Sequence, residues 1–361
     1  MAGERTVRVL VTGPDINDAG GAGVQRHVRT LVDCFSRDDH AAIEPFRATS
    51  AQYKEPWLLK IGRLAVRYAA FPFAARRADV VHVNASIDDR SLLRDAGFVM
   101  LTRLLRRSVL LQFHGGHPDT ARVLHIPVLR RLLVRVMRAS QHVLFLSEGQ
   151  GEPMREIFGF GSVEYVKNYV PVPALSDGAL KAADGLHVLY FGRLDEPKGV
   201  RETIEGFCAA RRAGWELRIA GTGSIAEEVA AKASVSEGVT YLGFLDDSAR
   251  DRELAWADVF VLPSAHPEGL PYAALEAAAA GVALVTSASG ALAQITRPGE
   301  TGLLVAARDS NALAEALMGL AEERTLLERM QTNAAQMVRD EYSLETMRDE
   351  FTRIYREVRS R

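Results

Sequence analysis

Glu268 and Glu276 bracket a segment whose composition predicts the start of a helix. The residues from Ala273 to Ala280 are strong helix formers, and Pro271 suits a first helical turn because its missing N–H would be unpaired there. The backbone N–H groups of such a turn have no partner within the helix, so they favour an anion. A carboxylate at each end of this donor array suits a ligand that carries hydroxyls on both sides of a phosphate.

A sugar nucleotide is such a ligand, because its diphosphate lies between a sugar and a ribose. The apolar run 259–262 before the segment and the run 282–285 after it predict two buried strands. Together they make a βαβ unit, with the carboxylate-bearing loop at the carboxyl edge of a parallel sheet. Two carboxylates alone are more simply explained as a solvated glutamate on a loop and another on a helix face.

Arg193 and Lys198 are two cations five residues apart, directly after the predicted strand 186–192. Two cations on a strand-to-helix loop can hold the oxygens of a diphosphate. The alternative is a pair of exposed loop charges.

Two further loops carry residue types suited to a site. Gly20, Gly21 and Gly23 follow the predicted strand 7–12 and let a ligand approach the backbone closely, although a turn without a ligand explains them equally well. Their spacing is not Gly-x-Gly-x-x-Gly, so a nicotinamide site is not supported. His114 ends the predicted strand 108–113 before two glycines, which places it at the ligand-binding edge of a sheet. A lone histidine is otherwise usually structural.

The motifs resemble those of retaining nucleotide-sugar glycosyltransferases of the GT-B fold, family four (glycosyl transferases group 1). The resemblance rests on Pro267-Glu268-Gly269-Leu270-Pro271, on Leu275-Glu276-Ala277, and on the string Gly-Arg-Leu-x3-Lys-Gly at 192–199. It implies an α/β fold of two Rossmann-like α/β/α domains that face each other across a cleft. It also implies catalytic roles for His114, Arg193, Lys198 and Glu268. The donor-binding residues that it implies are Gly21, Gly23, Gly192, Arg193, Lys198, Gly221, Gly223, Phe244, Leu245, Glu268, Gly269, Leu270, Pro271 and Glu276.

The implied reaction moves a hexose-type sugar from a nucleoside diphosphate sugar to an acceptor hydroxyl, with retention of configuration. Arg193, Lys198 and the helix N-terminus would stabilise the leaving diphosphate, which is the electrostatic contribution that is usually largest in catalysis. Glu268 would hold sugar hydroxyls, Glu276 the ribose hydroxyls, and His114 would touch the sugar. No metal-ligand motif is evident, so we expect neither a metal nor another cofactor.

Other functions fit parts of this pattern. A sugar-nucleotide epimerase or a phosphorylase could share the fold, although no lysine context for pyridoxal phosphate is evident. A binding protein without activity is a further alternative, against which the joint presence of Glu268, Glu276, Arg193 and Lys198 argues. The acceptor is expected to be a bacterial cell-surface polysaccharide or glycolipid, or else a small molecule. The base, the sugar and the linkage cannot be deduced from the motifs.

Length and charge suggest two domains with different partners. We place an acceptor-side domain at 1–170 and a nucleotide-sugar-binding domain at 171–342, and we expect the C-terminal helix 343–361 to pack back on the first domain. Residues 1–170 contain 24 Lys and Arg against 17 Asp and Glu, an excess of +7, and the remainder carries −9. A basic half suggests an anionic partner, and no nucleic-acid motif is evident.

Two segments of the first half concentrate the cations. Residues 54–77 place Leu58 and Ile61 on one helical face and Lys60 and Arg63 on another, and 127–138 carries four arginines. A basic amphipathic helix can lie on an anionic membrane, whereas the alternative is a surface helix whose apolar stripe packs in the core. The two distant cysteines, the lack of a signal-peptide core and the lack of a long apolar run predict a cytoplasmic protein. Peripheral contact with the inner face of the cell membrane is a further expectation.

Overall fold

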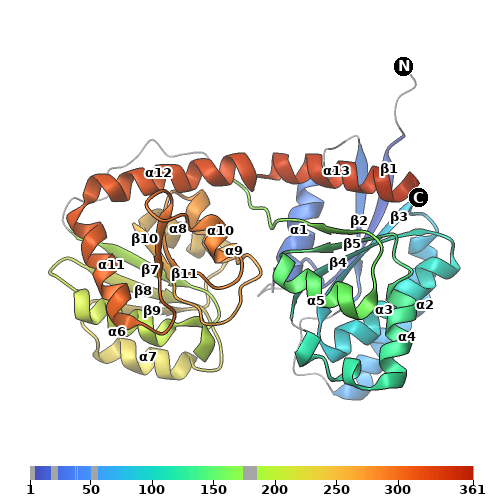
Figure 1. The fold of residues 1–361 in the computed structure, drawn as a ribbon, viewed down its shortest axis with the longest axis horizontal. Coiled ribbons are helices and arrows are strands. Elements are labelled where there is room, and N and C mark those ends of the chain that lie inside the picture. The colour runs from blue at the N-terminus through green and yellow to red at the C-terminus, as the bar shows by residue number, and fades with distance from the viewer. Residues whose placement is uncertain are drawn as a thin grey trace. The chain divides into compact units, whose positions relative to one another are not determined.

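The computed structural model describes residues 5–17, 23–36, 38, 40–49, 56–116, 118–173 and 185–360. The chain divides into two compact units. The first comprises Met1–Tyr169 and Leu344–Arg361, and the second comprises Val170–Ser343. In the described part of the chain, each unit is built on its own six-stranded parallel sheet with helices on both faces (Figure 1).

The sheet of the first unit has the strand order β2-β1-β3-β4-β5-β6. Its strands are β1 (Val7–Gly13), β2 (Ala41–Arg47), β3 (Val80–Ile87), β4 (Ser108–Gly116), β5 (His142–Phe145) and β6 (Val163–Tyr165). The central strand β3 is buried along nearly its whole length and β4 through its middle, Val109–Phe113, as expected for parallel strands that are covered on both faces.

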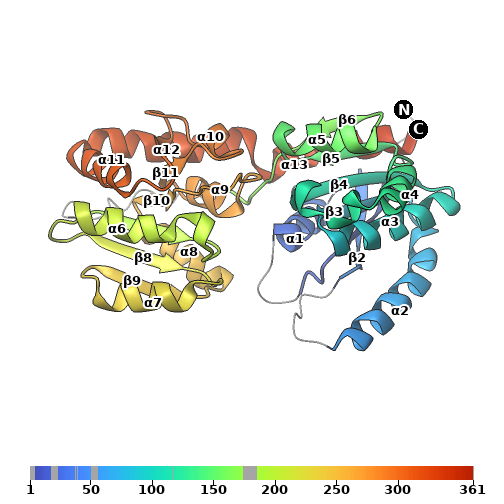
Figure 2. The ribbon, with the colours of Figure 1, turned by 60° about the horizontal axis from the view of Figure 1, so that its bottom comes forward.

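Helices cover both faces of this sheet (Figure 2). One face packs against α2, α3, α4 and α5 around Phe71, Phe98 and Phe145, and the other packs against α1 and α13 around Phe351 and Tyr355. The helices of this unit are α1 (Gly23–Phe35), α2 (Trp57–Ala75), α3 (Asp89–Leu104), η1 (Pro118–Thr120), η2 (Arg122–His125), α4 (Pro127–Met137), α5 (Glu148–Phe158) and α13 (Leu344–Ser360).

The predicted basic helix is α2, and its apolar residues divide between core and surface. Phe71 near its C-terminus is fully buried, whereas Leu58 is 64% and Ile61 56% exposed. The interpretation of the whole apolar stripe as core is therefore wrong for the first half of the helix and correct for the end.

The sheet of the second unit has the order β12-β11-β10-β7-β8-β9, and every pairing in it is parallel. Its strands are β7 (His187–Phe191), β8 (Glu216–Ala220), β9 (Val239–Gly243), β10 (Val259–Leu262), β11 (Ala283–Ser287) and β12 (Gly302–Val305). Its helices are η3 (Glu196–Lys198), α6 (Val200–Ala210), α7 (Ala226–Val235), α8 (Asp247–Trp256), α9 (Tyr272–Ala279), α10 (Leu292–Ile295), α11 (Ser310–Glu322) and α12 (Arg324–Glu341). One continuous apolar core holds these layers together.

The strand order of the second unit reverses between β7 and β10, which are neighbours in the sheet although far apart in the sequence. In open α/β sheets, ligands bind outside the carboxyl ends of the strands at such a reversal. The loops that follow β7 and β10 therefore meet where this fold places a ligand. These are the loops that carry Arg193, Lys198 and Glu268.

The predicted α/β class with two Rossmann-like units is confirmed. The edge strand β2, Ala41–Arg47, was not expected from the sequence. It contains Pro45, which lacks the N–H that a central strand would need and is tolerated only at an edge.

Candidate functional site

Lys198 and Glu268 come together between the two loops at the strand-order reversal of the second unit. Lys198 Nζ donates to Glu268 Oε1 at 2.6 Å and to Oε2 at 2.8 Å, and the Ser264 hydroxyl donates to Oε1 at 2.6 Å. Ser264 is fully buried, and the Glu268 side chain is 7% exposed. The carboxylate is thus held by a cation and a hydroxyl, in a site that keeps some access to solvent.

The loop beneath these residues is fixed from the core side. Tyr190 at the end of β7 donates its hydroxyl proton to the carbonyl oxygen of Arg193 at 3.0 Å, and the carbonyl oxygen of Lys198 lies 3.5 Å from the same hydroxyl. Burial, and then the negative charge of Glu268, raise the pKa of Tyr190 well above its usual range. Tyr190 therefore stays protonated and ties both ends of the cation-bearing loop to the sheet.

Arg193 lies at the solvent-facing edge of the same loop and pairs with Asp195. The Ser224 N–H and hydroxyl donate to Asp195 Oδ1 at 3.1 and 2.9 Å. Burial would raise the pKa of Asp195, but the hydrogen bonds from Ser224 and the charge of Arg193 outweigh it and lower that pKa. The Arg193 side chain is 77% exposed, so its guanidinium remains accessible to an anion.

The glycine loop after β8 lies directly against the strand end that carries Arg193. A Cβ on Gly221 would fall 1.7 Å from the carbonyl oxygen of Gly192, and one on Gly223 would fall 2.3 Å from the carbonyl oxygen of Leu194. Side chains are excluded at both positions because the two loop backbones touch. This close packing leaves the Gly221–Ser224 backbone at the same edge as the cations.

The N-terminus of α9 completes this edge. Leu270 has a left-handed φ of 66° and is 1% exposed, an unusual conformation for a residue with a branched side chain. Pro271 is the N-cap of α9 rather than a member of its first turn, which corrects the expected helix start by one residue. Such backbone strain tends to collect at ligand-binding sites, and here it lies next to Glu268 and Gly269.

Glu276 lies inside α9, nearly buried, and its Oε2 is 3.7 Å from Nε of Arg250 on α8. Burial would lower the pKa of Arg250, but Glu276 and two aspartates outweigh this effect and raise it. No motif in the sequence points to Arg250, because the strand β10 separates α8 from α9 along the chain. The pair fixes the carboxylate that was expected to receive ribose hydroxyls.

Phe244 and Leu245 follow β9 at the same edge of the sheet. Phe244 is 58% exposed and Leu245 is half-buried. An exposed aromatic ring beside a nucleotide-type site offers a stacking surface for a base. Gly192 and Gly269 lie in the loops already described, so the second unit gathers its predicted residues along one edge.

In the first unit, His114 lies at the end of β4 and its Nε2 is 2.6 Å from Asn84 Oδ1. Asn84 Nδ2 donates to the carbonyl oxygen of Thr12 at 2.9 Å, so Asn84 must turn its oxygen toward the histidine. His114 therefore carries its proton on Nε2 and keeps Nδ1 as an acceptor. Burial, and then His27 and His82, lower the pKa of His114 well below its usual range, so the ring is neutral.

His27 and His82 extend this group into the core. The His27 ring lies 4.5 Å from that of His114 and 6.2 Å from that of His82, measured between centroids. His82 bonds the Tyr355 hydroxyl and the Gln112 side chain at 3.0 Å each. Burial lowers the pKa of both His27 and His82 to about 3. No motif in the sequence points to these two histidines, although each lies on a predicted element.

Of the predicted glycines of the first loop, Gly23 is the first residue of α1, and Gly21 lies outside the described residues. Among the residues that the structure describes, no three His, Cys, Asp or Glu side chains are grouped so as to hold a metal ion. Metal independence stays a prediction. No helix in the described ranges is both long and apolar enough to cross a bilayer.

Comparisons with known proteins agree with the motif-based assignment. Residues 185–323 match the family model of glycosyl transferases group 1. The chain is 31% identical over 228 residues to a glycogen synthase of Mycobacterium tuberculosis, covering 61% of this chain and 55% of the relative. It is 32% identical over 209 residues to a phosphatidyl-myo-inositol mannosyltransferase of Mycobacterium leprae, covering 56% and 55%. The chain thus spans about half the length of these curated relatives.

The fold extends across the whole chain. The Anabaena protein Alr3699/HepE, solved in complex with UDP and glucose, superposes with a TM-score of 0.74 at 17% identity, covering 97% of this chain and 100% of that chain. The predicted GT-B fold is therefore confirmed. At this level of identity the likeness establishes the fold alone.

Proposed function

We propose that this protein is a retaining glycosyltransferase that moves a hexose-type sugar from a nucleoside diphosphate sugar to an acceptor hydroxyl. The observation that carries the proposal is the Lys198–Glu268–Ser264 cluster, located where the strand order reverses and next to the N-terminus of α9. Cations and helix N-terminal N–H groups suit a diphosphate, and a buried carboxylate suits sugar hydroxyls. The match of residues 185–323 to the family model of glycosyl transferases group 1 supports this interpretation.

In the proposed reaction, the bond between the anomeric carbon and the diphosphate oxygen breaks, and the acceptor oxygen bonds to that carbon on the same face. The acceptor's proton passes to the departing phosphate oxygen. Arg193, Lys198 and the N–H groups near Gly269 stabilise the charge that develops on the diphosphate. Glu268 holds sugar hydroxyls and Glu276 holds the ribose. No step in this scheme requires a metal or another cofactor.

We assign His114 to the transferred sugar. Because its Nε2–H is committed to Asn84, the neutral ring can only accept, through Nδ1, a hydrogen bond from a hydroxyl. His114 therefore orients a sugar hydroxyl rather than donating a proton to the leaving group. This assignment follows the resemblance and the hydrogen-bond network of the first unit.

The acceptor is proposed to be a polysaccharide or glycolipid of the bacterial cell surface, reached on the cytoplasmic side of the membrane. The basic first unit and the similarity to a phosphatidyl-myo-inositol mannosyltransferase support a glycolipid. The second candidate is a small-molecule acceptor, which needs no membrane contact. We propose UDP as the first nucleotide to test, because the Anabaena protein of the same fold was solved with UDP.

The test combines donor binding with product analysis. A thermal-shift panel of UDP, GDP and ADP should identify one stabilising nucleotide, and the matching sugar nucleotide should be hydrolysed slowly without acceptor and consumed faster with one. Proton NMR of the product should show the anomeric configuration of the donor. Stabilisation by none of the diphosphates, or an inverted product, would contradict the proposal.

A further inference from the structure

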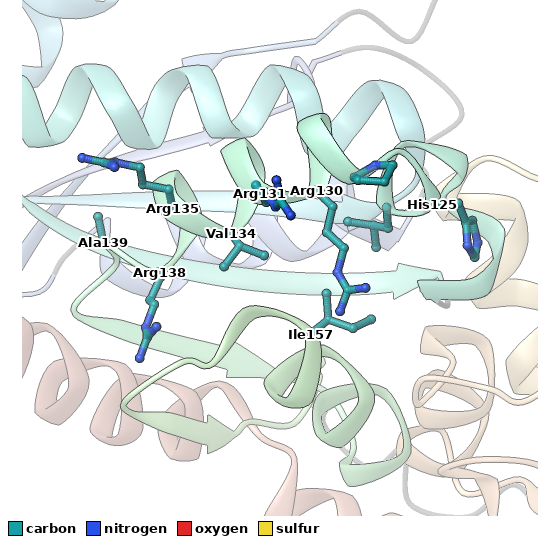
Figure 3. Close-up of a pocket in the computed structure, with 10 residues that line it drawn as sticks. His125, Arg130, Arg131, Val134, Arg135, Arg138, Ala139 and Ile157 are labelled. Carbon is teal, nitrogen blue, oxygen red and sulfur yellow. The ribbon is translucent and has the colours of Figure 1, made fainter.

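The first unit contains an open groove lined by four arginines, apart from every residue of the proposed donor site. The groove has a volume of about 1060 Å³ and lies along α4 and α5. Arg130, Arg131, Arg135 and Arg138 line it together with Val134 and Ile157, and its lining contains no aspartate or glutamate. Figure 3 shows the Arg130 side chain extending toward Ile157 of α5.

These four guanidinium groups make no ion pair or side-chain hydrogen bond with the described residues. Several surface arginines of the second unit are paired, by contrast: Arg201, Arg211 and Arg212 each bind a glutamate at 2.6 Å. Four cations held close together without a counter-charge repel one another, so the groove is suited to an anion that the protein itself does not supply. Arginine is the side chain best matched to phosphate oxygens.

The same helix also presents apolar side chains to solvent. Val128 is 73% and Leu132 56% exposed. Val128, Arg131, Leu132 and Arg135 follow the spacing i, i+3, i+4 and i+7, so they share one face of α4. Cations interleaved with exposed apolar side chains are typical of a helix that lies in a membrane interface, where the guanidinium groups reach the headgroups.

A second helix of the same unit has a similar surface. α2 packs on the same side of the sheet as α4, with α3 between them. It exposes Leu58, Ile61 and Val66, at 64%, 56% and 69%. A free phosphate would use the arginines of α4 but not these apolar groups, whereas a lipid bilayer would use both.

We propose that the arginine groove of α4 binds the phosphate headgroups of an anionic membrane, with Val128 and Leu132 entering the interface beside it. A lipid surface at this groove would lie beside the unit that is proposed to take the acceptor. The assignment rests on the proposed function only where it identifies that acceptor as a glycolipid. Vesicle binding itself requires no turnover.

The test is flotation of the full chain with vesicles that contain phosphatidylglycerol, compared with vesicles of phosphatidylcholine alone. We expect binding to the anionic vesicles only, and its loss when salt rises from about 0.1 M to about 1 M, as the Debye length falls from about 10 Å to about 3 Å. R131Q/R135Q should weaken the partition coefficient roughly 25-fold, since each cation near an anionic surface contributes about fivefold. V128S/L132S should weaken binding without changing its salt dependence.

The matched control is R308Q/R329Q, which removes two exposed and unpaired arginines from the second unit. It should bind the vesicles as the parent chain does. All variants should keep the thermal shift given by a nucleoside diphosphate, which separates this proposal from the donor site. The inference would be overturned by equal binding to both vesicle types, or by an equal loss of binding in the R308Q/R329Q control. It would also be overturned if the groove bound inorganic pyrophosphate and the protein bound neither type of vesicle.

Discussion

Because Lys198 pairs with Glu268, replacing either residue should change the stability of the second unit and its affinity for a nucleoside diphosphate in different ways. Replacing Lys198 with Met removes a cation that donates to both carboxylate oxygens, at 2.6 and 2.8 Å. Charge-assisted hydrogen bonds contribute about 1.5–3 kcal/mol, and a buried charge left without its partner costs about 3–5 kcal/mol. Because 19% of the Lys198 side chain is exposed, solvent reduces this cost, and we expect a loss of about 2–3 kcal/mol.

Such a loss lowers the melting temperature of a domain of this size by roughly 4–12 °C. The measurement is thermal and urea unfolding of K198M, E268Q and the double variant K198M/E268Q. The two single changes break the same pair, so their effects should not add, and the coupling free energy should be about 2 kcal/mol. Additivity to within about 0.5 kcal/mol would show that the pair contributes little to stability.

Nucleotide binding should respond differently to the two single changes. K198M should weaken binding of the nucleoside diphosphate, because it removes a phosphate-binding cation. E268Q should leave that affinity equal or tighter, because it releases Lys198 from its carboxylate partner. Both should reduce kcat/KM by a factor that corresponds to about 2–4 kcal/mol of transition-state stabilisation.

The assay is calorimetric titration with the diphosphate that stabilises the parent chain, alongside transfer rates. The result that would refute the reasoning is an unchanged diphosphate affinity in K198M. Weaker diphosphate binding in E268Q than in K198M would also refute it, because Glu268 would then contribute more to the phosphate site than Lys198 does.

Further predictions follow from the other parts of the two units. Glu276→Gln should raise the donor dissociation constant without unfolding the protein, which titration and a melting curve check together; unchanged affinity would leave Glu276 a structural partner of Arg250. Arg193→Ala should cripple turnover and weaken diphosphate binding at little cost in stability, since its side chain is 77% exposed. Activity should survive EDTA, and loss that magnesium or manganese restores would show a metal requirement. The first unit should be acid-labile, because burial lowers the pKa of His27 and His82 to about 3. Below pH about 6.5 these two histidines are protonated in the unfolded chain but still neutral in the folded one. The free energy of unfolding therefore falls with pH by about 1.4 kcal/mol per pH unit for each histidine. Asp95, whose pKa burial raises to about 6, opposes this between pH about 4 and 6, and His27→Gln should reduce the slope of unfolding free energy against pH by one histidine's share.

The fold was predictable from the sequence because local patterns and motifs agree. Buried parallel strands appear as short β-branched runs, and the helices between them have capping residues and apolar stripes. One element without a sequence prediction, β2, is an edge strand with Pro45 in it and an alternation of buried and exposed residues that is incomplete. Its pairing with β1 holds it in place, and that pairing is a tertiary effect with no local signature.

The sequence predicts the ligand type of a site residue more readily than it predicts the side chains that contact that residue. A loop cation suggests a phosphate ligand, and Lys198 was interpreted in that way. Its partner Glu268 lies 70 positions away, and only the adjacency of β7 and β10 brings the two together. Asn84 and Arg250 have no sequence signal for the same reason, since each acts through a residue on another element.

The pairing changes what Lys198 can do before a ligand arrives. A lysine without a carboxylate partner would lie beside the positive N-terminal end of the α9 dipole, and the local charge would be positive and unbalanced. With Glu268 in contact, the loop after β7 and the loop after β10 are held together while the charge is balanced. An incoming diphosphate must compete with Glu268 for Lys198, and the sugar that it carries offers Glu268 hydroxyls in exchange. A sugar nucleotide can therefore satisfy both partners, whereas a bare diphosphate satisfies only the cation, so the pair favours the donor over its own product.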